Sequence, residues 1–118
     1  MRVFVYGTLL DPEVLARRAG TPGLGARMVP AMLAGFRRVR MGTTPWPTLR
    51  RDPAHIVPGA VINVGLDAFR RLSAYEGPRY RLSPVAVATP LGQTRARKIR
   101  AFAWLAPGGT RHAWGEIR

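Results

Sequence analysis

The sequence contains few side chains that could carry out acid–base or nucleophilic chemistry. It has no cysteine, which removes thiolate nucleophiles, disulfides and cysteine-based metal sites. Among its six acidic residues, Glu76 stands apart because it lies between Tyr75 and Tyr80, just past an apolar helix face. The other five are explained more simply as helix caps, a first-turn residue, a loop residue and a residue near the C-terminus: Asp11, Glu13, Asp52, Asp67 and Glu116. Glu76 is therefore the candidate base if this protein is an enzyme.

Several common catalytic arrangements lack the residues that they need. The two histidines, His55 and His112, have no cysteine or carboxylate at ligand spacing, so we expect neither a metal ion nor a cofactor. Ser73 and Ser83 are the only serines, and neither has the flanking glycines of a nucleophile elbow. Residues 5–9 (VYGTL) are not followed by the lysine of a phosphate-binding loop.

Two features remain that could act together. The turn formed by Gly7, Thr8 and Leu9 exposes backbone amides after a first strand, and Glu76 supplies a carboxylate. Taken alone, the turn is also explained as an ordinary strand end. Taken alone, Glu76 is also explained as a solvated residue at the end of a helix.

The elements that would position these groups begin with a strand over residues 2–6. Alternation places Val3 and Val5 on one face of this strand and Phe4 and Tyr6 on the other. A helix follows, and its start and end are marked by a capping aspartate, a proline in the first position and a terminating glycine. These residues are Asp11, Pro12 and Gly20.

The rest of the chain predicts further strands, one more helix and two irregular stretches. Asp67 is expected to cap a helix that carries Leu66, Phe69 and Leu72 at helical spacing and ends near Glu76. Strands are expected over residues 31–39, 59–64, 80–89 and 98–106, and irregular stretches over residues 21–30 and 42–58. The second irregular stretch holds four prolines, and loops of that length are often functional.

These elements predict the fold class. Several short strands and two short helices in 118 residues favour one α+β domain over residues 1–118. We expect its sheet to be barrel-like or strongly curved, with the short helices flanking it.

The net charge of +13 has two interpretations. A basic surface attracts polyanions, which favours a phosphate-bearing partner. Alternatively, the charge reflects composition, because 18 of the 19 basic residues are arginine and they are dispersed along the chain, eight of them as four adjacent pairs. Only residues 95–98 (RARK) form a tight cluster, which we expect at a hairpin turn.

The sequence shows neither a targeting segment nor a membrane span. Met1 leads directly into the first strand, so no signal peptide is expected. No apolar run approaches the roughly 20 residues that a membrane helix needs. We therefore expect a cytoplasmic protein that has no membrane partner.

Two motifs resemble those of a known family. Residues 4–9 (FVYGTL) resemble the Tyr-Gly-Thr/Ser-Leu signature of the γ-glutamylcyclotransferase-like family. Residues 72–81 (LSAYEGPRYR) resemble its second motif, in which the glutamate is catalytic and is followed by Tyr-x-Arg. Matches to its Pro-x-Leu loop, its Val-x-Gly-x-Val/Leu strand and its aromatic last strand occur in order at residues 47–49, 57–61 and 102–104. The resemblance implies a small β-barrel with flanking helices and a pocket at one end.

The sequence departs from the family pattern at three places. Ser73 follows Leu72 where the family often has aspartate, and Trp46 replaces the usual tyrosine before Pro-x-Leu. Leu10 and Asp11 replace the polar or basic pair that often follows the first motif. These departures concern substrate identity and leave the expected fold unchanged.

The resemblance implies a reaction in which the substrate supplies the nucleophile. The α-amine of a γ-glutamyl group attacks its own γ-carbonyl, 5-oxoproline forms, and an amino acid or amine leaves. The enzyme then needs no serine or cysteine. It needs a base, which would be Glu76, and its position at a helix C-terminus and its burial would raise its pKa toward the useful range.

The remaining needs are an oxyanion site and an oriented substrate. Backbone N–H groups of Gly7, Thr8 and Leu9 would bind the developing oxyanion and the substrate carboxylate. Tyr6, Tyr80 and the loop around Trp46 would form walls that hold the substrate folded for ring closure. Tyr80 is equally well explained as a core aromatic residue that opens a strand. Trp104 and Trp114 are expected to pack.

Two other functions stay open at the level of sequence. The first is a basic barrel that binds single-stranded nucleic acid, which the charge allows but the scarcity of aromatic residues among the arginines disfavours. The second is a member of the same fold that binds a small molecule without turnover. The leaving group could be an amino acid, an amine, a peptide lysine or a biosynthetic intermediate, and the oligomeric state is left open.

Overall fold

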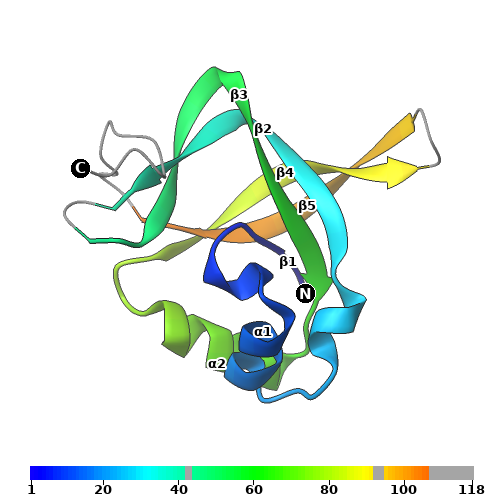
Figure 1. Cartoon of the computed structure of the whole chain (residues 1–118), viewed down its shortest axis with the longest axis vertical. Helices are drawn as coiled ribbons and strands as arrows, with labels where there is room; N and C mark the ends of the chain where they lie inside the picture. Colours follow the sequence, from blue (N-terminus) through cyan, green and yellow to red (C-terminus); the bar gives the residue numbers. More distant parts are fainter. Residues whose placement is uncertain (42–43, 92–94, 107–118) are drawn as a thin grey trace.

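The computed structural model describes residues 1–41, 44–91 and 95–106, which form a closed five-stranded barrel with two helices against one side (Figure 1). The strands run in the order β1-β3-β2-β4-β5 around the barrel. Their bounds are β1 Arg2–Val5, β2 Val29–Arg40, β3 Pro47–Asn63, β4 Arg81–Leu91 and β5 Arg95–Leu105. The helices are α1 Pro12–Ala19 and α2 Leu66–Glu76, with 3₁₀ helices η1 Thr8–Leu10 and η2 Leu24–Arg27. The expected α+β class and barrel are confirmed.

Strand β1 separates two apolar cores, and its alternation is as predicted. Val3 and Val5 face the layer between barrel and helices, where they pack with Leu15 and Leu72. The opposite face turns into the barrel, where Phe4 packs among side chains of the other four strands. Burial on both faces explains why this four-residue strand is almost wholly apolar.

The two helices begin at different kinds of capping residue. The Asp11 side chain accepts hydrogen bonds from the N–H groups of Glu13 and Val14, at 2.9 and 3.4 Å, and Gly20 ends α1, as predicted. The predicted capping role of Asp67 is wrong. Gly65 occupies the N-cap of α2, and Asp67 lies within the first turn, where a carboxylate is favoured by the helix dipole.

The prediction of an irregular segment over residues 42–58 is wrong for residues 47–58, which belong to β3. Strand β3 begins at Pro47 and pairs antiparallel with β2, from Arg40↔Pro47 to Val29↔Val61. The prolines misled the prediction because Pro47 opens the strand and Pro53 lies where the pairing shifts between Ala34 and Phe36. Both are positions that a sheet tolerates for proline.

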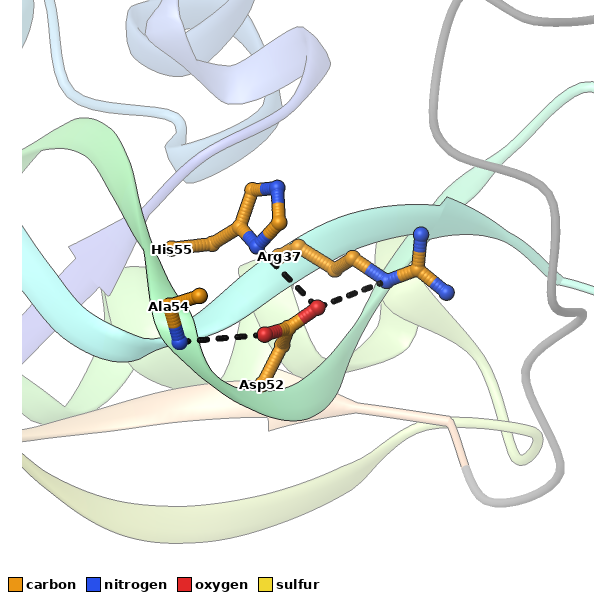
Figure 2. Close-up of polar contacts among 4 residues, drawn as sticks. All are labelled: Arg37, Asp52, Ala54 and His55. Atoms are coloured by element: carbon orange, nitrogen blue, oxygen red, sulfur yellow. Dashed lines mark hydrogen bonds and ion pairs between the residues drawn. The ribbon is translucent and has the colours of Figure 1, made fainter.

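Asp52 lies at the register shift in β3, although it was predicted to be an ordinary loop residue. Its carboxylate accepts a hydrogen bond from the Ala54 N–H at 3.1 Å and lies 3.0 Å from His55 Nδ1 and 3.4 Å from Arg37 Nε (Figure 2). The hydrogen bond with His55 is the main cause that lowers the pKa of Asp52. These exposed contacts assign a local structural role to Asp52 and His55, whereas His112 lies outside the described residues.

Three smaller predictions need correction. In the strand expected over residues 31–39, the alternation of Met32, Ala34 and Phe36 suggested an apolar face. The buried residues at the start of β2 are instead Ala31 and Leu33, and Met32 and Ala34 are exposed. The predicted loop over residues 21–30 contains η2. The basic cluster at residues 95–98 forms the start of β5 and is not a turn.

The described helices are short. None of them is both long enough and apolar enough to cross a bilayer.

Candidate functional site

A cavity of about 280 Å³ opens where β1 ends, between the barrel and the C-terminus of α2. It collects residues from η1, from the start of β3 and from the turn after α2, so that residues as far apart in the sequence as Thr8 and Tyr80 line one cavity. The sequence-predicted site residues all line it, namely Tyr6, Gly7, Thr8, Leu9, Glu76 and Tyr80. The walls otherwise comprise Phe4, Val5, Met41, Trp46, Pro47, Tyr75, Pro78, Arg79 and Trp104.

Glu76 is the last residue of α2 and, among the residues that the structure describes, the only acidic one in this lining. The helix stops there because Gly77 has φ of 82° and ψ of 178°, a region almost restricted to glycine, and Pro78 follows. Within the described residues the side chain of Glu76 makes no hydrogen bond or ion pair. Burial without a compensating partner raises its pKa to about 7. The carboxyl group is thus poised to exchange a proton near neutral pH.

The hydroxyl groups of Tyr6 and Tyr80 are both bound to backbone carbonyls. Tyr80 donates to the Pro47 carbonyl at 2.7 Å, and Tyr6 donates to the Trp104 carbonyl at 2.5 Å. Burial is the main cause that raises both pKa values, that of Tyr80 to about 12, and the Glu76 carboxylate contributes to both. Both hydroxyls therefore stay protonated at neutral pH. Each retains a lone pair able to accept a hydrogen bond from a ligand.

The turn after β1 is rigidly held against the cavity. Thr8 and Leu9 open η1, so their N–H groups have no partner within that helix. Gly7 passes so close to β3 that a Cβ there would lie 3.0 Å from Pro47 Cγ. The Thr8 hydroxyl lies 3.0 Å from the Tyr75 hydroxyl, which joins the turn to α2. A backbone donor group and a proton-exchanging carboxyl group thus line the same cavity.

Three contributors to this site were missed by the sequence analysis. Arg38 Nη1 donates to the Tyr6 carbonyl at 2.9 Å and so fixes the end of β1. Thr48 is fully buried, and its hydroxyl donates to the Ala106 carbonyl at 3.1 Å while accepting from the Ala106 N–H at 2.8 Å. Tyr75 covers the cavity edge under the Arg18 guanidinium, which lies 4.7 Å from its ring centroid.

Only Tyr75 carried a signal in the sequence, because it is adjacent to Glu76. The contacts of Arg38 and Thr48 depend on the first part of β3, residues 47–58, which was predicted to be irregular. Trp104 packs as expected, with its ring centroid 5.9 Å from that of Phe69, and it also lines the cavity. Trp114 lies outside the described residues.

Metal binding finds no support in the same region. The described residues contain no group of three or more histidine, aspartate or glutamate side chains placed to hold a metal ion.

Comparisons with known proteins agree on one family. The sequence model of the family described as "Gamma-glutamyl cyclotransferase, AIG2-like" matches residues 3–116. The chain is 31% identical over 108 residues to Protein AIG2 C of Arabidopsis thaliana, a match that covers 87% of the chain and 61% of the relative. The chain thus spans less than two thirds of the length of this curated relative.

Solved structures share the fold. An Arabidopsis thaliana protein with a known solution structure has 26% identity and a TM-score of 0.74, over 91% of this chain and 68% of that one. A gamma-glutamyl cyclotransferase has 20% identity and a TM-score of 0.71, over 93% and 68% of the two chains. At that identity the second likeness concerns the fold alone.

Proposed function

The chain belongs to the AIG2-like gamma-glutamyl cyclotransferase family, and from this premise we propose that it releases 5-oxoproline from a γ-glutamyl compound. The observation that carries the proposal is the pairing of Glu76 with the turn at Gly7 in one cavity. This pairing offers a proton acceptor and backbone donors, and it offers no side-chain nucleophile. A reaction in which the substrate attacks itself needs only those two groups and a shape that holds the substrate folded.

Glu76 acts in this proposal first as base and then as acid. Its carboxylate accepts a proton from the α-ammonium group of the substrate, and the freed amine nitrogen attacks the γ-carbonyl carbon. The new C–N bond closes a five-membered ring. Glu76 then donates its proton to the departing nitrogen, the original amide C–N bond breaks, and the carboxylate is restored. The second proton of the ring nitrogen passes to the released amine, which leaves neutral 5-oxoproline and an ammonium group. A pKa of about 7 suits both directions of transfer at neutral pH.

The backbone stabilises the tetrahedral intermediate in this scheme. The N–H groups of Thr8 and Leu9 point from the first turn of η1 and would bind the oxyanion, with Gly7 allowing close approach. Tyr6 and Tyr80 would hold the γ-glutamyl group on the inner side, and Trp46 would cover it from the rim. Because the tyrosine hydroxyls are anchored to carbonyls, these walls are preorganised before substrate arrives.

Product stoichiometry tests the proposal. Purified protein is incubated with γ-glutamyl amino acids, γ-glutamyl amines and γ-glutamyl-ε-lysine, and 5-oxoproline, free amine and free glutamate are quantified. The proposal requires 5-oxoproline and amine in equal amounts for at least one substrate. Release of glutamate with the amine would indicate hydrolysis and would contradict intramolecular attack. Saturable binding of these compounds without any product would favour the non-catalytic member of the fold.

A further inference from the structure

A second cavity, of about 200 Å³, lies at the other end of β1. Its lining residues come from the start of β1, from η2, from the start of β2, from the end of β3, and from strands β4 and β5. Three arginines from three different elements line it, Arg2 of β1, Arg27 of η2 and Arg97 of β5. Asn63 and Thr89 supply an amide and a hydroxyl group to the same lining.

Strand alternation places these polar residues on the strand faces that turn toward the barrel interior. Arg2 follows the same face as Phe4, and Arg97 the same face as Ala101, and both Phe4 and Ala101 are buried inside the barrel. Arg2 pairs with Asn63 and Thr89 pairs with Arg97 across neighbouring strands. By alternation these two cross-strand polar pairs continue the inward-facing rows to the open end of the barrel, where Thr89 is buried, Arg2 is half-buried, and Asn63 and Arg97 are exposed.

The positive charge of this cavity is not balanced nearby. None of the five acidic residues in the described part of the chain lines it. No ion pair or side-chain hydrogen bond engages the guanidinium groups of Arg27 and Arg97 within residues 1–41, 44–91 and 95–106. A concave site with charge of one sign concentrates ions of the opposite sign.

The donors in the cavity are suited to an oxyanion. Arg2 Nη1 donates to the Arg100 carbonyl at 3.1 Å, which holds that guanidinium group in place and leaves its other N–H groups available. Thr89 is 8% exposed and donates weakly to the Arg97 carbonyl at 3.4 Å. Guanidinium groups bind phosphate oxygens in a bidentate fashion, so three arginines lining one cavity favour phosphate over a monovalent halide.

We propose that this cavity binds a small phosphate-class oxyanion, either free phosphate or a single terminal phosphoryl group. The volume of about 200 Å³ lies below the roughly 300 Å³ at which pockets for drug-sized ligands begin, so a compact anion fits better than a whole nucleotide. The site is independent of the proposed cyclotransferase chemistry, because none of its lining residues belongs to the cavity that contains Glu76.

The test is a titration with inorganic phosphate at constant ionic strength, followed by calorimetry and by amide chemical shifts. Chloride is the control anion, and a single-stranded oligonucleotide is a second ligand. Arg27→Gln and Arg97→Gln together should weaken phosphate binding by at least ~10-fold, because each charge-assisted contact is worth about 1.5–3 kcal/mol. The matched control is Arg70→Gln, which removes an exposed arginine of α2 and should change binding by less than about 2-fold.

The outcomes separate a defined site from general charge. Shifts that concentrate on the amides of Asn63, Thr89 and Arg97 in the unaltered protein support the site even if the double variant folds poorly. Equal losses of phosphate affinity in Arg70→Gln and the double variant would overturn the proposal. So would binding of the oligonucleotide alone, or an equal response to chloride, since either would indicate diffuse electrostatic attraction.

Discussion

At the scale of single residues, the proposed reaction depends on the carboxyl group of Glu76. It is the one acidic side chain in its cavity, and its pKa is raised to about 7 because burial disfavours the charged form and no partner offsets that cost. Ionisation of Glu76 therefore lowers the stability of the folded state, and the same cost raises the affinity of its carboxylate for a proton. Two predictions follow from that pKa, one for catalysis and one for stability.

The first concerns the pH dependence of turnover. If Glu76 must be ionised to accept a proton, kcat/KM for 5-oxoproline release should rise as pH increases through about 7 and then level off. An acidic limb near pH 4.5, the ordinary value for a glutamate, would show that the base is a solvated carboxyl group. The measurement is kcat/KM between pH 5 and 9 with a substrate of known affinity.

The second concerns stability, and its sign follows from linkage. The folded state binds the Glu76 proton more tightly than the unfolded chain, so stability declines as pH rises from about 4.5 to about 7. Glu76→Gln removes this loss. The variant should gain roughly 3 kcal/mol relative to the unaltered protein between pH 4 and pH 8, in proportion to the shift. Denaturant unfolding at the two pH values measures the difference, and the same stability difference at both would contradict the raised pKa.

At the scale of elements, the end of α2 decides where Glu76 lies. Gly77 adopts φ of 82° and ψ of 178°, and a Cβ there would meet nothing within 4 Å, so the requirement is one of backbone conformation alone. Gly77→Ala should cost about 1–3 kcal/mol of stability and should also lower kcat, because relief of strain would redirect Glu76. Thermal unfolding and turnover measure the two effects.

The other end of the same helix offers the control. Gly65 has φ of −78°, which alanine adopts freely, and it also meets nothing within 4 Å. Gly65→Ala should therefore change stability much less than Gly77→Ala and leave turnover nearly unaltered. Equal effects at the two ends would mean that the conformation of Gly77 has no special role.

Elements whose signals are local were predicted correctly from the sequence. The Asp11 cap, the proline after it and Gly20 fix α1 without reference to the rest of the chain. The end of β3 was predicted as a strand over residues 59–64. Its earlier part, residues 47–58, was missed because its pairing with β2 is non-local and overrides the prolines, two of which occupy its first residue and its register shift. Asp67 was misassigned because Gly65, two residues earlier, takes the cap position.

At the scale of the whole molecule, barrel closure assembles a site that the sequence indicated only in pieces. Glu76 and Gly7 were singled out from two motifs, and their placement in one cavity agrees with that reasoning. The contacts of Arg38 with Tyr6 and of Thr48 with Ala106 arise from strands distant in sequence, so no local pattern could indicate them. The cavity at the other barrel end was missed for the same reason, since its arginines come from three elements.

Net charge is also a property of the whole molecule. At +13, mutual repulsion should destabilise the folded state, and added salt should screen it. Raising NaCl from about 20 to 200 mM should therefore raise Tm by a few degrees. A Tm that falls over this range would show that attractive charge pairs outweigh the repulsion. Buffers free of phosphate keep this effect separate from binding at the second cavity.

The central claim is that Glu76 transfers the proton in 5-oxoproline formation, and its most direct test is turnover by Glu76→Gln. Glu13→Gln, which alters an exposed carboxylate in the first turn of α1, is the matched control. We expect kcat/KM to fall at least ~10²-fold in Glu76→Gln, the lower end for loss of a general acid–base group, and to stay within about 2-fold in Glu13→Gln. Undiminished 5-oxoproline release by folded Glu76→Gln would contradict the claim.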